Sequence, residues 1–158
     1  MIRKLSIYNI ILVEEARIHL KGGFNVLSGE TGSGKSAVLA ALNLLAGNRS
    51  DADLIRHGAE KGVVEGLFDI HKNDEVLEIL DRAGIAHERT EELIIRREVA
   101  ATGRGRIYIN NQAVQRALLK EIGSHLIESV GQHASQRLLD LDQHREILDT
   151  YGEVEKLS

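Results

Sequence analysis

The sequence of 158 residues contains no cysteine and no proline, and aromatic residues make up only 3% of it. Without cysteine, the chain can form neither disulfides nor thiolate metal sites, and this suits a reducing compartment. No apolar run approaches the roughly 20 residues that span a bilayer, and the N-terminus lacks the layout of a signal peptide. Because 42% of the residues are hydrophobic, these absences predict a soluble intracellular protein with an aliphatic core.

The net charge of −4 argues against a protein whose whole surface binds nucleic acid. The densest basic patch consists of Arg96, Arg97, Arg104 and Arg106. We expect these side chains on the solvated outer faces of two neighbouring strands, as is usual for arginine. The length allows one domain, or part of a larger one.

One segment matches the pattern G-x-x-x-x-G-K-[ST] at every fixed position. Glycines let the backbone curl so that successive N–H groups surround phosphate oxygens, and a helix that follows directs its positive dipole end at the same anion. We therefore predict binding of a nucleoside triphosphate, with Lys35 at the β- and γ-phosphates and Ser36 as a ligand of Mg²⁺. The predicted phosphate-binding residues are Gly29, Glu30, Thr31, Gly32, Ser33, Gly34, Lys35 and Ser36.

The flanks of this loop fit the strand–loop–helix context that such a site requires. Residues 24–28 are a short apolar run typical of a buried strand. The helix is expected over residues 37–46, with Gly47 at its C-terminal cap. Its apolar stripe consists of Val38, Leu39, Leu42 and Leu45.

The rest of the chain alternates between strand and helix patterns. Residues 2–20 predict two antiparallel strands, and Asn110–Asn111 predicts a tight turn with positive φ. Further strands are expected over 63–70, 93–99 and 106–109, and helices over 74–83, 112–122 and 142–151. Together these patterns predict an α/β fold, in which a P-loop core sheet adjoins a largely antiparallel sheet with flanking helices.

Hydrolysis of ATP also needs a carboxylate at a strand end to hold the Mg²⁺ water shell. Residues 66–69, ending at Asp69, are the nearest match, but the run is short and contains a glycine. Residues 126–128, ending at Glu128, fit no better. The missing acidic strand end predicts that this chain is the first part of a split ATPase.

Several motifs of this chain resemble those of known ATPase families. Residues 5–9 and the loop Gly29–Ser36 resemble the SMC-like ABC ATPases, and residues 49–58, 107–111 and 131–136 look most like the RecN family of bacterial DNA repair proteins. The resemblance implies a P-loop NTPase fold of the ABC-type head lobe. Residues 1–152 would be the N-terminal half of the ATPase head, and residues 153–158 the start of a coiled coil or a truncated tail.

The resemblance also implies roles for two further residues. Gln132 resembles the Q-loop glutamine, which reaches Mg²⁺ and the attacking water, although a polar cap at a strand end would look the same. Arg56 falls where SMC-like ATPases carry an arginine that can approach the phosphates, and a solvated loop cation remains the alternative. The chain departs from the family where Asn9 is followed by Ile10–Ile11 rather than by an arginine.

By this resemblance the cofactors are ATP and Mg²⁺, and the function belongs to recombinational repair of DNA breaks. The implied partners are a C-terminal half-head on the same or a second chain, a second head in a homodimer, and DNA through the full protein. The implied location is the cytoplasm, associated with the nucleoid. Two other interpretations stay open, namely a self-contained P-loop kinase for a small molecule and a nucleotide-binding assembly module without catalysis.

Overall fold

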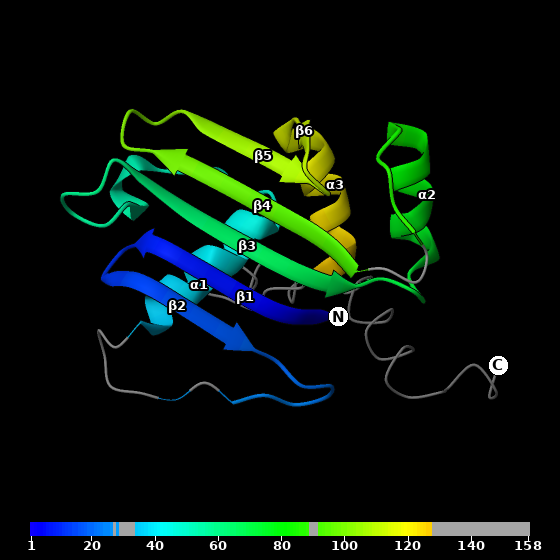
Figure 1. The fold of residues 1–158 in the computed structure, drawn as a ribbon, viewed down its shortest axis with the longest axis horizontal. Helices are drawn as coiled ribbons and strands as arrows, with labels where there is room; N and C mark the ends of the chain where they lie inside the picture. The colour runs from blue at the N-terminus through cyan, green and yellow to red at the C-terminus, as the bar shows by residue number, and fades with distance from the viewer. Residues whose placement is uncertain (27, 29–33, 89–91, 128–158) are drawn as a thin grey trace, which may run out of the picture. The chain divides into compact units, whose positions relative to one another are not determined.

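The computed structural model describes residues 1–26, 28, 34–88 and 92–127. The described residues belong to the compact unit Met1–Ile127. Its centre is a sheet of six strands in the order β2-β1-β3-β4-β5-β6, shown in Figure 1. The helix predicted over residues 142–151 lies outside the described residues.

All pairings among these strands are antiparallel. The strands are β1 Ile2–Ile10, β2 Val13–His19, β3 Lys61–Asp69, β4 Glu92–Ala100, β5 Gly105–Ile109 and β6 Gln112–Val114. Alternate residues point to one buried face, as Leu5 and Ile7 do on β1 and Leu93 and Ile95 do on β4, because side chains alternate along a strand. The prediction of a largely antiparallel sheet is confirmed, whereas the described residues form no parallel core sheet.

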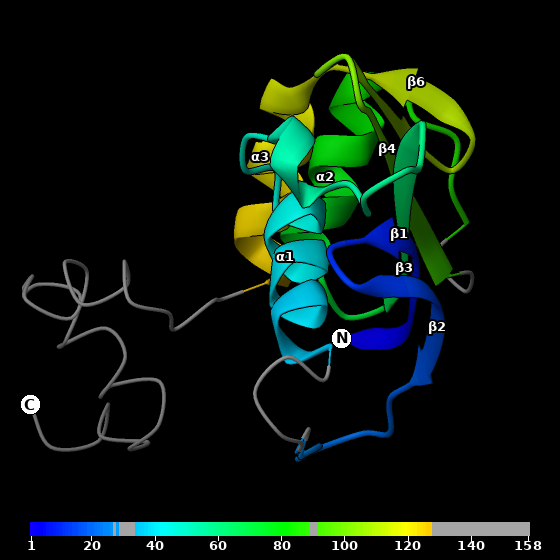
Figure 2. The ribbon, with the colours of Figure 1, turned by 90° about the vertical axis from the view of Figure 1, so that its left-hand side faces the viewer.

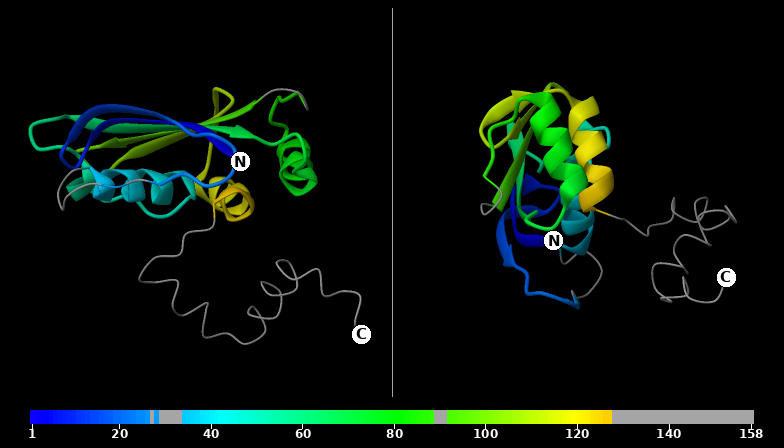
Figure 3. Two further views of the ribbon diagram at one scale, coloured as in Figure 1. Left: turned by 90° about the horizontal axis from the view of Figure 1, so that it is seen from below. Right: turned by 90° about the vertical axis from the view of Figure 1, so that its right-hand side faces the viewer.

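The helices all cover the same face of the sheet, which Figures 2 and 3 show edge-on. They are α1 Lys35–Leu45, α2 Asp74–Ala83 and α3 Arg116–Leu126, and a short 3₁₀ turn, η1, spans Ala52–Leu54. The predicted helix over residues 74–83 is confirmed, and Gly84 caps it with a φ of 70°. Within the described ranges, no helix is long and apolar enough to cross a membrane.

Helix α1 packs across β1, β3 and β4. Its buried residues are Ala37, Ala41, Leu44 and Leu45, while Leu39 is 59% exposed, so the predicted apolar stripe is wrong at Leu39. Two alanines in the buried stripe let the helix lie close to the sheet. Gly66 of β3 adds room, because a Cβ there would lie 2.8 Å from Cδ1 of Leu45.

The segment before the phosphate loop differs from the prediction. Residues 24–26 and Ser28 form no strand, and Phe24 and Val26 are 92% and 73% exposed. A buried strand needs neighbouring strands and side-chain cover, and no described strand lies beside this segment.

The predicted helix over residues 112–122 begins later than expected. Asn110 and Asn111 have φ values of 46° and 64°, so the chain turns back tightly as predicted. The turn sets Gln112–Val114 against β5 as strand β6, with Ile107 opposite Val114. The helix therefore starts only at Arg116. The prediction placed its start too early because local periodicity carries no signal for a strand pairing.

Candidate phosphate-binding site

The start of α1 has the geometry of an anion site. Gly34 precedes the helix with a φ of 96°, a left-handed conformation that favours glycine. No described side chain caps this end, and the first turn contains no acidic residue. The first N–H groups of the helix therefore lack side-chain acceptors and present the positive end of its dipole.

Lys35 and Ser36 are the first two residues of this helix, and they are half-buried and exposed, respectively. The predicted residues Gly29, Glu30, Thr31, Gly32, Ser33 and Gln132 lie outside the described residues. The described part of the candidate site therefore consists of the helix start and what surrounds it.

The turn between β1 and β2 lies against the start of α1. A Cβ added to Gly34 would lie 3.4 Å from Cγ2 of Val13, so the first residue of β2 packs on the beginning of the helix. Its neighbour Glu14 faces Arg56, with 3.9 Å between a carboxylate oxygen and Nη2. Arg56 and Gly34 thus both lie against this turn, although they are 22 residues apart in sequence.

Backbone contacts hold Arg56 in place. Its N–H donates to the carbonyl of Asn9 at 2.9 Å, Ile11 donates to Leu54 at 2.8 Å, and Ile10 bridges to Ile55. Its side chain is 43% exposed and its only described ion pair is the distant one with Glu14. Such a solvated pair is weak, so the guanidinium can leave Glu14 for a stronger anion.

Sequence reasoning did not predict the contributions of Val13 and Glu14. Their contacts join residues 9–14 to residues 34 and 54–56, and local periodicity carries no signal for such a contact. The apolar Ile10, which stands where the family pattern departs, is completely buried. It serves the core beneath this turn.

Asp69 is the last residue of β3, and Figure 1 shows that β3 ends near the N-terminus, at the opposite end of the sheet from the β1–β2 turn. Phe68, the neighbour of Asp69, pairs with Ile2, whereas Val13 pairs with Ile10. These two positions of β1 are about 27 Å apart at the rise of an extended strand. Asp69 therefore cannot serve a metal ion held at the start of α1.

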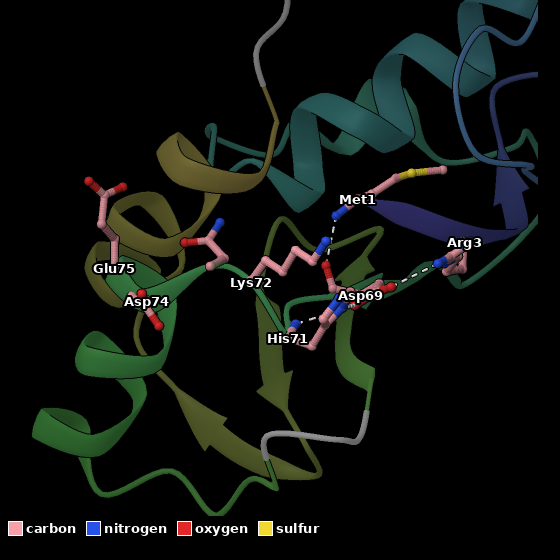
Figure 4. Close-up of a pocket in the computed structure, with 8 residues that line it drawn as sticks. Met1, Arg3, Asp69, His71, Lys72, Asp74 and Glu75 are labelled. Atoms are coloured by element: carbon pink, nitrogen blue, oxygen red, sulfur yellow. Dashed lines mark hydrogen bonds and ion pairs between the residues drawn. The ribbon is translucent and has the colours of Figure 1, made fainter.

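Figure 4 shows the interactions of Asp69 instead. Its carboxylate pairs with Nδ1 of His71 and, at 2.7 Å, with Nη2 of Arg3, and the terminal ammonium of Met1 donates to its carbonyl at 2.7 Å. The hydrogen bonds from His71 and Arg3 hold the pKa of Asp69 well below its ordinary value. These groups line a pocket of about 720 Å³ and tie the N-terminus to the end of β3.

Comparison with known proteins decides the family. The AAA domain family matches residues 4–156, nearly the whole chain. The chain belongs to the AAA domain family. It is 35% identical to the DNA repair protein RecN of Bacillus subtilis over 155 residues, which are 98% of this chain and 27% of that protein. The RecN resemblance predicted from the motifs is confirmed.

Solved structures of SMC proteins have the same fold as this chain. An Smc head domain of Pyrococcus furiosus, bound to the C-terminal domain of ScpA, superimposes with a TM-score of 0.69 at 22% identity, over 94% of this chain and 41% of that one. An SMC ATPase chain from a study of ATP-driven dimerization superimposes with a TM-score of 0.67 at 23% identity, over 94% and 97% of the two chains. The predicted ABC-type head lobe is thereby confirmed as the fold.

The chain spans only about a quarter of the length of its RecN relatives, 27% for the protein of Bacillus subtilis. The activity of the full-length proteins is therefore only proposed for this chain.

Proposed function

We propose that this chain binds ATP and Mg²⁺ as the P-loop half of an ATPase head in a RecN-like protein of recombinational DNA repair. The observation that carries the proposal is the left-handed Gly34, which precedes a helix start without a side-chain cap, within a complete phosphate-loop sequence. Backbone amides of Gly29–Gly34 and the first turn of α1 hold the phosphates. Lys35 adds a charge at the β- and γ-phosphates.

Ser36 would hold Mg²⁺ through its hydroxyl, with Gln132 as a second oxygen ligand that also orients the attacking water. The exposed position of Ser36 in the first turn of α1 fits this task, because the hydroxyl is next to the phosphate-binding amides. The metal ion would offset negative charge that develops on the phosphates.

Arg56 would provide the second cation at the phosphates. Its position beside the β1–β2 turn, which packs against Gly34, and its loose pairing with Glu14 at 3.9 Å support this role. A guanidinium gains more from a phosphate than from a solvated carboxylate, since its planar donors match phosphate oxygens in pairs.

The described unit also supports the proposal that the head is completed by another segment. Phe24 and Val26 are exposed next to the phosphate loop, and Leu39 is exposed on α1. Large apolar side chains that are left exposed favour burial against a partner. We propose a C-terminal half-head, on the same or a second chain, that covers them and supplies the missing carboxylate.

In this proposal two complete heads form a homodimer around ATP, in keeping with the ATP-driven dimerization studied for the SMC ATPase that shares this fold. DNA would be engaged by the full protein, in the cytoplasm at the nucleoid. Neither step is assigned to a residue of this chain.

Calorimetric titration with ATP and Mg²⁺ tests the binding site directly. Lys35→Ala removes a charge-assisted contact and should weaken ATP binding by about 2–3 kcal/mol. Lys120→Ala, which removes an exposed lysine of α3, is the matched control and should leave the affinity unchanged. Equal affinities of the wild-type chain and Lys35→Ala would refute the proposed site.

A further inference from the structure

A second basic site lies at the far end of α1. It is a pocket of about 570 Å³ beside β5 and β6. Three of its lining residues are the arginines Arg97, Arg106 and Arg116, and none is acidic. Ser50, Tyr108 and Gln115 add further hydrogen-bonding groups to its wall.

Arg97 is the most unusual member, because its side chain is almost wholly inside the protein. The prediction that it lies on the outer face of its strand is wrong, since the residue is only 3% exposed. It pairs in register with Ile107 and points to the helix-covered face. Its Nη1 donates to the carbonyl of Leu44 at 2.7 Å and to that of Asn48.

These two hydrogen bonds use only one of the three guanidinium nitrogens. Nε and Nη2 of Arg97 donate to no described residue. In the described part of the chain, one buried side-chain atom lacks a hydrogen-bond partner, and it belongs to His87. Nε and Nη2 of Arg97 are therefore not counted as buried atoms without a partner. Their donors therefore reach the solvent of the pocket.

Arg116 repeats this arrangement. Its Nη1 donates to the carbonyl of Gly47 at 3.3 Å, and it forms no ion pair with a described residue. It also opens α3, whose first turn has no acidic residue and whose N-cap, Gln115, makes no capping hydrogen bond. The positive end of this helix dipole adds to the two guanidinium charges.

The charges in this region do not balance. Arg106 pairs with Glu98, and both side chains lie on the opposite face of the sheet from Arg97, because side chains alternate along a strand. On that face Glu98 is bonded to Arg96 at 2.9 Å and lies 3.9 Å from Lys61, so it does not neutralise Arg97 or Arg116. Burial, and secondarily the charge of Arg116, lower the pKa of Arg97 to about 10, so it is still a cation at neutral pH. The pocket therefore has excess positive charge and unused planar donors.

We propose that this pocket, with Arg97 and Arg116 as its donors, binds a phosphate group. Paired guanidinium donors match the oxygens of phosphate, and a partly desolvated site makes each such contact strong. The pocket is separate from the phosphate loop, because it lies by Leu44 and Gly47 at the end of α1 whereas the loop lies at its start. The 11 residues of α1 place these sites about 16 Å apart along the helix.

Pyrophosphate binding to the Lys35→Ala chain tests the pocket alone, since that variant weakens the phosphate loop. Calorimetry should show pyrophosphate binding that Arg116→Gln weakens by about tenfold or more. Arg104→Gln, which removes an exposed arginine outside the pocket, should have no effect. Arg97→Lys, which keeps the charge but loses the planar fork, should also weaken binding.

The outcomes separate this proposal from the proposed function. Loss of all pyrophosphate binding in Lys35→Ala would overturn the arginine pocket and leave the phosphate loop standing. Equal binding in the Lys35→Ala chain with and without the arginine substitutions would overturn it too.

A second measurement identifies the source of the phosphate. Fluorescence anisotropy of a labelled 20-nucleotide DNA strand would show binding that weakens with salt and with the same arginine substitutions, if the ligand is a nucleic-acid backbone. Pyrophosphate binding without DNA binding would support the pocket with a free phosphate compound as its ligand. Binding of neither probe to the Lys35→Ala chain would exclude the site.

Discussion

At the scale of single residues, Asp69 shows how a carboxylate can fit a motif and yet serve another purpose. It ends a strand, as a catalytic acid would, but it pairs with His71 and Arg3 beside the N-terminus. Its pKa is lowered by these partners, so the folded state favours the charged form. Its contribution to stability is therefore present above the ordinary aspartate pKa of about 3.9 and is lost as the pH falls through the lower folded value.

We expect Asp69→Asn to be less stable than the wild-type chain at pH 7, and the difference to shrink as the pH falls below about 4. Urea denaturation at pH 7, 4 and 3 measures it. Asp53→Asn, which changes an exposed aspartate without an ion pair to a described residue, is the control. A difference that stays constant from pH 7 to pH 3 would contradict the assigned ion pairs.

Gln132 is a residue whose proposed role appears only during hydrolysis. A group that acts on Mg²⁺ and water contributes mainly in the transition state, so Gln132→Ala should lower turnover much more than ATP affinity. Paired calorimetry and single-turnover measurements on a head reconstituted with its C-terminal half would check this. Wild-type turnover in Gln132→Ala would mean that Gln132 only caps a strand end.

At the scale of elements, the contact between the end of α1 and helix α3 is very close. A Cβ added to Gly123 of α3 would lie 2.5 Å from the carbonyl oxygen of Ala46, and one added to Gly47 would lie 2.5 Å from the backbone of Lys120. Two backbones approach each other here with no space for a side chain. The glycines therefore fix where α3 crosses the end of the phosphate-loop helix.

Gly123→Ala reveals which effect is larger, helix propensity or packing. In a free helix this substitution stabilises by about 1 kcal/mol, whereas overpacking against a backbone oxygen costs about 1–3 kcal/mol or more. We expect a net loss of stability in urea denaturation. Gly103→Ala, where φ is 84° but the space is open, should cost only about 1 kcal/mol. A stabilised Gly123→Ala would show that the two helices lie farther apart.

At the scale of the whole molecule, the described unit contains the proposed phosphate-binding helix start but no acidic strand end beside it. Mg²⁺ and water are then poorly positioned for hydrolysis. We expect the chain alone to bind ATP and to hydrolyse it no faster than buffer, and we expect turnover to appear when the C-terminal half-head is added. Steady phosphate release by the purified chain, absent in Lys35→Ala, would instead favour a self-contained enzyme.

The strand and helix order of this chain was largely determined by local sequence. Alternation predicted β3 and β4, and the capping glycine Gly84 predicted the end of α2, because these signals depend on residues close together in the chain. The phosphate loop stays a prediction, which depends on fixed residue types at fixed spacing. The family followed from the order of such motifs.

Tertiary structure decided what depends on distant residues. It exposed the segment around Phe24, because that segment has no described partner strand, and it buried Arg97, because the end of α1 offers carbonyls for its guanidinium. It also placed Arg56 beside Gly34 through the β1–β2 turn. Neither periodicity nor composition contains such contacts, since they arise only when separate elements pack against one another.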